Sequence, residues 1–187
     1  MRVLFMGPPG AGKGTQAALL AQRLGIVHIS TGDIFRSNVS QGTPLGVRAK
    51  AFMDKGEYVP DDVTNDMVRD RLAQPDAQAG FILDGYPRTV AQVLELDGML
   101  ADAGEQLDAV IELTADTDEL VQRLSKRAQE QGRTDDTPEV IRRRLEVYAD
   151  STAPLIALFA ERGILTAVDG LGAIDDVTAR LVTALTN

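Results

Sequence analysis

The sequence "GPPGAGKGTQ", Gly7–Gln16, follows the apolar run Val3–Met6 and precedes a helix-like segment. It matches the G-x-x-x-x-G-K pattern in the strand-to-helix context that is typical of a phosphate-binding loop. Glycines let the backbone curl so that successive N–H groups point inward, and the N-terminus of the following helix adds its dipole. Lys13 is then placed to reach the β- and γ-phosphates of a nucleoside triphosphate. The other residues expected around the phosphates are Gly10, Ala11, Gly12, Gly14 and Thr15.

The composition limits what else the chain can be. Its 187 residues, 44% hydrophobic and 25% charged, suit one globular domain. The formal net charge of −9 argues against a general affinity for nucleic acid or for an anionic membrane. All but four of the 19 basic residues are arginine, whose planar fork grips phosphate with two hydrogen bonds. There is no cysteine, which excludes disulfides and cysteine-ligated zinc.

The apolar run at the N-terminus has two interpretations. It looks briefly like a signal peptide, but it is short and stops at Gly7–Pro9, so it favours a buried strand. No apolar stretch approaches the length that a membrane span needs. We therefore expect a soluble, cytoplasmic protein with no membrane partner.

Short apolar runs alternate with longer amphipathic segments along the whole chain. This alternation predicts an α/β fold with a parallel sheet covered by helices on both faces. Ligands of such sheets bind outside the carboxyl ends of the strands, so residues that directly follow a strand are the first candidates for a site. The five expected strands are Val3–Met6, Val27–Ser30, Phe81–Leu83, Ala109–Leu113 and Leu165–Val168. The expected helices lie near Gly14–Leu24, Asp33–Val39, Leu45–Lys55, Asp61–Ala73, Val90–Ala103, Asp118–Arg127, Pro138–Ala149, Leu155–Arg162 and Ile174–Leu185.

Two intervals break this alternation. Thr31–Asp61 inserts helical material between the second strand and the helix that precedes the third. Arg127–Thr137, "RAQEQGRTDDT", is polar, contains a glycine and has no apolar period. Both intervals are candidate mobile flaps within a single domain.

Four segments together resemble the adenylate kinase family, in its short-lid bacterial form. They are "GPPGAGKGTQ", "ISTGDIFR" (Ile29–Arg36), "FILDGYPRT" (Phe81–Thr89) and "GRTDDT" (Gly132–Thr137), and they occur in the family's order across essentially the whole chain. The resemblance implies a P-loop nucleoside monophosphate kinase fold: one domain, 1–187, with an acceptor-binding flap at about 30–59 and a short lid at about 126–137. It also implies reversible transfer of the terminal phosphoryl group of Mg·ATP to AMP, which gives two ADP.

Two details fit the same family. The common phosphate loop has a serine or threonine directly after its lysine, whereas here Gly14 intervenes and Thr15 carries the hydroxyl, as is the family's habit. The short lid resembles the form without the longer insertion that carries a zinc site in some members. We therefore expect Mg²⁺ and ATP, and no structural zinc.

The segment "STGDIFR", after the second strand, has two interpretations. Ser30 or Thr31 can cap a helix that begins near Asp33, and Arg36 is then only a solvated charge. The residues alone leave this alternative about as open as a nucleotide site. The resemblance implies that Thr31 contacts the acceptor base and Arg36 its phosphate. It also implies that the backbone of Glu57, Tyr58 and Val59 lines the acceptor nucleoside, with Met53 as a further candidate against the base.

The segment "FILDGYPR" places a carboxylate at the end of the third strand. Asp84 then lies beside the phosphate loop if the two strands are neighbours, where it can hold Mg²⁺ through water together with the Thr15 hydroxyl. The alternative is a turn aspartate that ends the strand. The resemblance implies that Arg88 holds the acceptor phosphate and that Gln92 reads the adenine edge. It also implies that Gly85, Tyr86 and Pro87 line the acceptor site.

Arginines cluster around the second interval. A helix that carries Arg142–Arg144 spreads them around its circumference, so that Arg144 lies beside the apolar stripe and the other two are solvated. The resemblance implies that Arg127 contacts the donor nucleotide, that Arg133 and Arg144 bridge the phosphates, and that Arg123 joins them. With Lys13 and Arg88, these are the expected catalytic residues.

Two further positions have a structural and a functional interpretation. Gly170–Gly172, after the last strand, is either an ordinary glycine turn or, as the resemblance implies, the place where Gly172 touches the donor adenine through its backbone. His28, the only histidine, lies in a strand-like run and is interpreted as structural. Transfer to a phosphate anion needs little proton chemistry, and two flaps that close over the substrates favour transfer over hydrolysis.

Other functions remain as alternatives. A kinase of UMP, CMP or a small metabolite would share the fold and the donor site. A nucleotide-sensing switch or GTPase is disfavoured because the N-K-x-D stretch of guanine readers is absent. Nucleic-acid binding has only the arginine cluster in its favour. We expect a monomer that binds the small-molecule substrates ATP and AMP, because the flaps must move freely.

Overall fold

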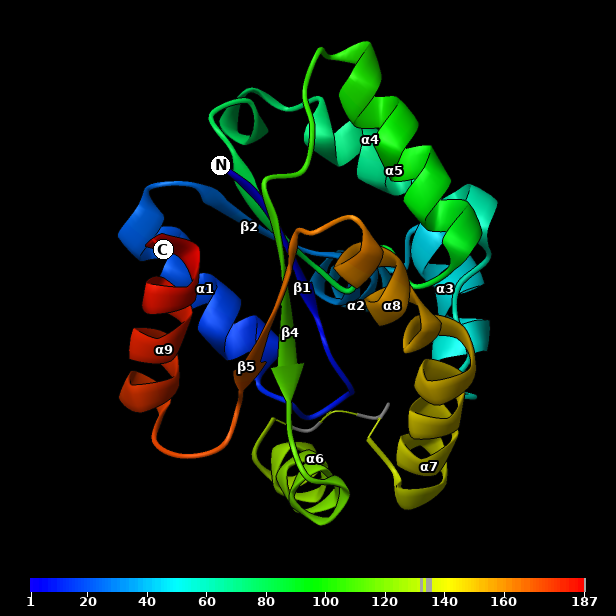
Figure 1. Cartoon of the computed structure of the whole chain (residues 1–187). Helices are drawn as coiled ribbons and strands as arrows, with labels where there is room; N and C mark the ends of the chain where they lie inside the picture. Colours follow the sequence, from blue (N-terminus) through cyan, green and yellow to red (C-terminus); the bar gives the residue numbers. More distant parts are fainter. Residues whose placement is uncertain (132, 134–135, 187) are drawn as a thin grey trace.

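The computed structural model describes residues 1–131, 133 and 136–186, and Figure 1 shows the arrangement of its elements. Three residues of the expected lid, Gly132, Thr134 and Asp135, lie outside the described residues, as does Asn187. Within the described part, five parallel strands form one sheet in the order β2-β3-β1-β4-β5. The strands are β1 (Arg2–Met6), β2 (Val27–Ser30), β3 (Phe81–Asp84), β4 (Ala109–Thr114) and β5 (Leu165–Asp169). The predicted parallel sheet is confirmed, each strand within one residue of its expected bounds.

The central strand β1 brings two functional segments together. It pairs with β3 on one side, where Phe5 lies opposite Asp84, and with β4 on the other, where Met6 lies opposite Glu112. The residues from Val3 to Met6 are buried because helices cover both faces of the sheet. Since the strands are parallel, the loop that follows β1 and the residues that follow β3 emerge at the same edge.

Helices cover both faces of this sheet (Figure 1). On one face α1 and α9 contribute Leu20 and Leu181 to a core that includes Phe5. On the other face α5 and α8 contribute Leu96 and Phe159. None of the helices in the described part of the chain is long and apolar enough to cross a membrane. The helices are α1 (Lys13–Leu24), α2 (Thr31–Gln41), α3 (Pro44–Met53), α4 (Asp61–Leu72), α5 (Val90–Asp102), α6 (Thr117–Gln131), α7 (Pro138–Val147), α8 (Pro154–Glu161) and α9 (Ile174–Thr186), with a 3₁₀ turn at Pro75–Ala77 and a π-helical turn at Tyr148–Thr152.

The inserted helical material predicted between β2 and α4 is present as α2 and α3. These two helices share a small core of their own, built on Phe35 and Ala49, with Val59 and Val63 from the following segment. Helix α2 begins at Thr31, and its N-cap is Ser30, whose hydroxyl accepts a hydrogen bond from the Asp33 N–H at 3.3 Å. The capping alternative for Ser30 is therefore realised, which leaves the Thr31 side chain for other contacts.

The structure differs from the sequence-based expectation in two places. Helix α6 continues through Gln131, four residues past Arg127, although this stretch has no apolar period. Its residues are good helix formers, and the Arg127 side chain is anchored on the lid by Asp136. The helix expected over Pro138–Ala149 changes at Tyr148 to a π-helical turn, a form that is often found at functional sites.

Candidate active site

The phosphate loop wraps the end of β1 and leads into α1. Gly7 has a φ of +134°, and a Cβ there would lie 2.4 Å from the Leu113 carbonyl oxygen, so only glycine lets the loop pass the end of β4. The Lys13 ammonium donates hydrogen bonds to the carbonyl oxygens of Gly7 at 2.8 Å and Pro8 at 2.9 Å. Helix α1 has no side-chain N-cap, so its first N–H groups are left to a ligand.

Positive charge converges on Lys13. Burial, together with the charges of Arg88, Arg144 and Arg127, lowers the pKa of Lys13 to about 8, against the opposing effect of Asp84. These arginines come from three separate parts of the chain, the turn after β3, α7 and α6. The arginines and burial disfavour the charged form of Lys13, so this site is complementary to a polyanion such as a triphosphate, which would offset their repulsion.

Asp84 lies beside the phosphate loop, as predicted. A Cβ at Gly14 would be 3.6 Å from Asp84 Oδ2, and His28 Nε2 is 4.0 Å from the same oxygen. One carboxylate next to a phosphate loop, with the Thr15 hydroxyl at the start of α1, fits the oxygen ligands that Mg²⁺ prefers alongside substrate phosphates. Among the described residues there is no cluster of three or more histidine or carboxylate side chains that could hold a metal by itself.

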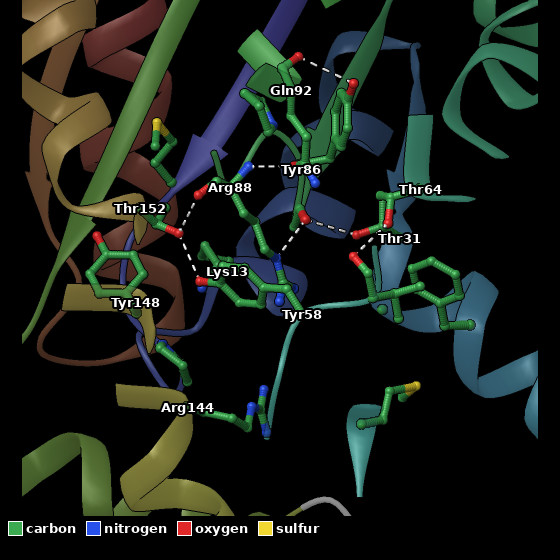
Figure 2. Close-up of a pocket in the computed structure, with 18 of the residues that line it drawn as sticks. Lys13, Thr31, Tyr58, Thr64, Tyr86, Arg88, Gln92, Arg144, Tyr148 and Thr152 are labelled. Atoms are coloured by element: carbon green, nitrogen blue, oxygen red, sulfur yellow. Dashed lines mark hydrogen bonds between the residues drawn. The ribbon is translucent and has the colours of Figure 1, made fainter. Parts of the chain in front are cut away.

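A pocket opens from Lys13 toward the inserted helices (Figure 2). Four cationic side chains line it, Lys13, Arg36, Arg88 and Arg144, together with apolar side chains such as Phe35. This combination of cations and apolar surface suits a ligand that carries both an anionic group and a flat, largely apolar group. The remaining expected acceptor residues that line it are Thr31, Glu57, Tyr58, Val59, Gly85, Tyr86, Pro87 and Gln92, together with Met53.

Thr31 and Arg36 face this pocket from α2. The Thr31 hydroxyl donates to the Gly85 carbonyl oxygen at 2.9 Å. A Cβ at position 85 would lie 2.6 Å from that hydroxyl, which explains why this position is a glycine. Arg36 Nη2 donates to Asp33 Oδ1 at 2.6 Å. Burial pushes the pKa of Asp33 upward, but the hydrogen bond and charge of Arg36 and the charge of Arg133 hold it below its ordinary value.

Gln92 is a buried residue of the pocket wall, and its amide is held from two sides. Its Nε2 donates to Asp61 Oδ1 at 2.6 Å, while its Oε1 accepts the Arg88 backbone N–H at 2.7 Å. The second oxygen of Asp61 accepts from the Thr89 hydroxyl at 3.0 Å. An ionised carboxylate can only accept and a backbone N–H can only donate. These partners therefore fix the orientation of the Gln92 amide, with Nε2 toward Asp61 and Oε1 toward the Arg88 N–H.

A single buried carboxylate organises the lid arginines. Asp136 Oδ2 accepts Arg127 Nε at 2.7 Å, and its Oδ1 accepts Arg127 Nη2 at 2.8 Å and Arg144 Nη1 at 2.6 Å. Burial would raise the pKa of Asp136, but the hydrogen bond from Arg127 and the charges of Arg127, Arg144 and Arg133 hold it below its ordinary value. The charge of Arg133 thus acts both on this lid carboxylate and on Asp33 at the start of the flap.

The turn after β5 is held by two arginines. Arg123 Nη1 donates to the Gly170 carbonyl oxygen at 3.1 Å, and Arg180 Nη2 donates to the Leu171 carbonyl oxygen at 2.5 Å. Gly172 follows with a φ of +108°. Arg123 therefore links α6 to the turn that was expected to touch the donor base.

The structure brings most of the expected residues together and adds several that sequence reasoning did not single out. Every expected acceptor residue lines the pocket except Arg133. Arg142 and Arg143 are exposed, as expected, but Arg143 Nε also donates to Glu57 Oε1 at 2.7 Å, which ties α7 to the flap. The residues missed were Asp61, Asp136, Tyr148 and Thr152. Asp136 alone had a signal, because it lies within "GRTDDT", a quoted motif to which only Arg133 contributed a role.

Comparisons with known proteins agree on one family. The sequence profile of the family described as "Adenylate kinase" matches residues 5–164. A protein named adenylate kinase from Nocardioides sp. is 62% identical over 185 residues, which are 99% of this chain and 97% of the relative. Another with this name from Kocuria rhizophila is 61% identical over 184 residues, 98% of each chain. A third, from Thermobifida fusca, is 57% identical over 185 residues, 99% of this chain and 98% of the relative.

Proposed function

This chain belongs to the adenylate kinase family and has adenylate kinase activity, and on that premise we propose which of its residues carry the reversible transfer of the terminal phosphoryl group from Mg·ATP to AMP, giving two ADP. The observation that carries the assignment is one continuous pocket that runs from Lys13 in the phosphate loop to Arg36 and Arg88 on the acceptor side. Transfer between two phosphates requires a donor site and an acceptor site that meet at the transferred group, and Lys13 lies where the two meet.

The donor nucleotide binds at the phosphate loop. Backbone N–H groups of Gly10–Thr15 cradle its phosphates, Lys13 reaches the transferred group, and Arg127 contacts the nucleotide from α6. The turn ending at Gly172 lies against the adenine, held in shape by Arg123 and Arg180. Asp84, through water, and Thr15 would hold Mg²⁺, which when bound supplies positive charge to the phosphate oxygens.

The acceptor AMP binds in the pocket. Arg88 and Arg36 grip its phosphate, while Thr31 and Gln92 contact its base and the segment Glu57–Val59 lines its sugar and base through backbone. The fixed amide of Gln92 supports adenine, because an amide that presents one N–H and one carbonyl lone pair in a set order matches only one order of donor and acceptor on a base.

Catalysis rests on alignment and on neutralising charge. The acceptor phosphate is already an anionic nucleophile, so no side chain has to remove a proton, and His28 has no part in the reaction. Lys13, Arg88, Arg133 and Arg144 surround the position of the transferred group and stabilise the charge that spreads over its oxygens. Asp136 keeps Arg127 and Arg144 aimed at that point.

Two segments act as flaps around this centre: 30–59 on the acceptor side and 126–137 on the donor side, within a single domain. Their closure excludes water and directs the phosphoryl group to AMP rather than to hydrolysis. The enzyme works in the cytoplasm. It works as a monomer, because both flaps need free space to open. No zinc site is proposed in the lid, since the chain has no cysteine.

The test is product formation from Mg·ATP with AMP, UMP, CMP, GMP or no acceptor in parallel. We expect two ADP for each AMP consumed and slow reactions with the other acceptors. Equal ADP formation without any acceptor would mean hydrolysis and would refute the acceptor site. Faster transfer to UMP or CMP than to AMP would refute the assignment of Thr31 and Gln92 to adenine.

A further inference from the structure

The side chain of Tyr58 reaches out of the acceptor flap to the body of the protein. Its hydroxyl lies 2.7 Å from Thr152 Oγ1, a residue 94 positions later in the chain. Thr152 is only 5% exposed and belongs to the π-helical turn before α8. Since the ring of Tyr58 also lines the acceptor pocket, this contact joins the flap to the pocket's opposite wall (Figure 2).

Thr152 in turn contacts Arg88, which lies in the turn after β3. Its hydroxyl donates to the Arg88 carbonyl oxygen at 3.0 Å. A threonine hydroxyl has one proton, so with that proton on Arg88 the Tyr58 hydroxyl must be the donor in the other hydrogen bond. The chain Tyr58–Thr152–Arg88 is therefore directional, and Figure 2 shows both hydrogen bonds.

Tyr58 also holds the guanidinium of Arg88 directly. Arg88 Cζ lies 4.8 Å from the centre of the Tyr58 ring, a cation–π contact, and Arg88 Nε donates to the Gly85 carbonyl oxygen at 2.7 Å. The ring and the carbonyl together fix the plane of the guanidinium. Within the described residues neither terminal nitrogen of Arg88 makes a hydrogen bond, so both are left for a two-pronged grip on phosphate.

A second contact joins the same edge of the flap to α7, but it is of a weaker kind. Arg143 Nε donates to Glu57 Oε1 at 2.7 Å, and both side chains are more than a third exposed. Exposed ion pairs of this sort contribute little and are screened by salt. The hydrogen bonds from Tyr58 to Thr152 and from Thr152 to Arg88 are part-buried, so they, rather than this ion pair, carry the link between the flap and Arg88.

We propose that Tyr58 is a positioning residue for phosphoryl transfer, which aims Arg88 at the acceptor phosphate only when the flap is docked on Thr152. Through this link, binding of the AMP phosphate and closure of the acceptor flap stabilise each other. The proposal rests on the assigned role of Arg88 in gripping the acceptor phosphate. It gives the Tyr58 side chain a function separate from the backbone contact expected at this position.

The test is steady-state kinetics of Tyr58→Phe, Thr152→Val and the double variant. Each single change removes the hydroxyl contact, so each should raise KM for AMP by about fivefold. The double variant should be no worse than Thr152→Val alone, because that change already breaks the whole link, including the hydrogen bond to Arg88. KM for ATP should stay within about twofold, since the donor site does not touch this link. Tyr58→Leu, which also removes the ring, should raise KM for AMP by about tenfold or more and lower turnover.

Thr178→Val is the matched control. The Thr178 hydroxyl is also buried, but it lies on α9. Its one proton is within hydrogen-bond distance of two acceptors, Gln16 Oε1 at 2.7 Å and the Ile174 carbonyl oxygen at 2.8 Å. Thr178→Val should lower the thermal midpoint about as much as Thr152→Val does and leave KM for AMP unchanged. If KM for AMP follows the loss of thermal stability in both variants, Tyr58 and Thr152 are merely structural.

The other outcomes are equally distinct. Additive effects in the double variant, or equal rises of KM for ATP and AMP, would overturn the proposal. If Thr152→Val does not fold, Tyr58→Phe and Tyr58→Leu still give the comparison, and an unchanged KM for AMP in both would overturn it. A wild-type protein that makes no ADP from AMP would instead refute the proposed function, while calorimetric binding of AMP would still measure the effect of Tyr58.

Discussion

Nucleotide affinity should weaken as pH rises above neutrality, because Lys13 in the phosphate loop has a low pKa. Burial and, to a smaller extent, the charges of the nearby arginines lower the pKa of Lys13 to about 8. A triphosphate bound beside the ammonium would favour its charged form and raise that pKa. Binding at pH 8 and above must therefore take up a proton, so the apparent affinity falls as the pH increases.

The expected size follows from the same pKa. If the lysine of the complex stays protonated throughout, the apparent Kd equals its low-pH value multiplied by the factor 1 + 10^(pH − pKa), where the pKa is that of Lys13 in the free enzyme. The Kd should then be about twofold weaker at pH 8 than at pH 7, and about tenfold weaker at pH 9. A tenfold change corresponds to about 1.4 kcal/mol. The phosphates themselves are fully ionised in this range, so they add no opposing trend.

Isothermal titration calorimetry with Mg·ATP at pH 7, 8 and 9, at constant ionic strength, would measure this dependence. Two buffers with different enthalpies of ionisation would count the protons taken up, which should approach one per nucleotide at pH 9. Lys13→Arg is the control, because arginine stays charged and should remove the pH dependence even if it binds less tightly. A wild-type Kd that is constant within about twofold from pH 7 to 9, with no proton uptake, would refute the reasoning.

Three further substitutions test other parts of the site. Arg88→Ala should lower turnover by at least about tenfold, or 1.4 kcal/mol, in steady-state kinetics, and a near-wild-type rate in the folded variant would remove Arg88 from the mechanism. Asp136→Asn should raise KM for ATP and cost about 2 kcal/mol in urea unfolding at pH 7. Because the pKa of Asp136 is held low in the folded protein, its stabilisation is present above its unfolded pKa and is lost as pH falls through the folded value. The stability difference from wild type should thus shrink in acid, and one that is equal at pH 7 and pH 3 would contradict this. Asp61→Ala frees the Gln92 amide to turn over, so the ratio of AMP to GMP efficiency should fall by about fivefold, whereas Asp62→Ala, its exposed neighbour, should leave the ratio unchanged.

Much of the molecule could be predicted from local sequence. Sequence predicted the phosphate loop, the alternation of strands and helices, and the position of Asp84. Each depends on a short pattern or on the rule that the carboxyl ends of parallel strands lie at one edge of the sheet. The strand bounds were also accurate, since buried parallel strands are nearly continuous apolar runs with glycine and proline at their ends. The end of α6 was not predicted, because its last turn, 128–131, is polar and carries no apolar period, and the Arg127–Asp136 ion pair lies at the start of that turn.

The primary sequence was thus sufficient for the fold and the reaction class, and it predicts which cations bind phosphate, because each of these features is carried by short motifs that are local in the chain. The partners that aim those cations depend on the folded chain. Asp136 holds Arg144 from across the lid, Asp61 holds Gln92, and Thr152 joins Tyr58 to Arg88. These contacts join residues from 8 to 94 positions apart, and a hydroxyl or carboxylate has no sequence signature for the partner it will meet. Their pairing is set by how the helices pack, which is why it became visible only in three dimensions.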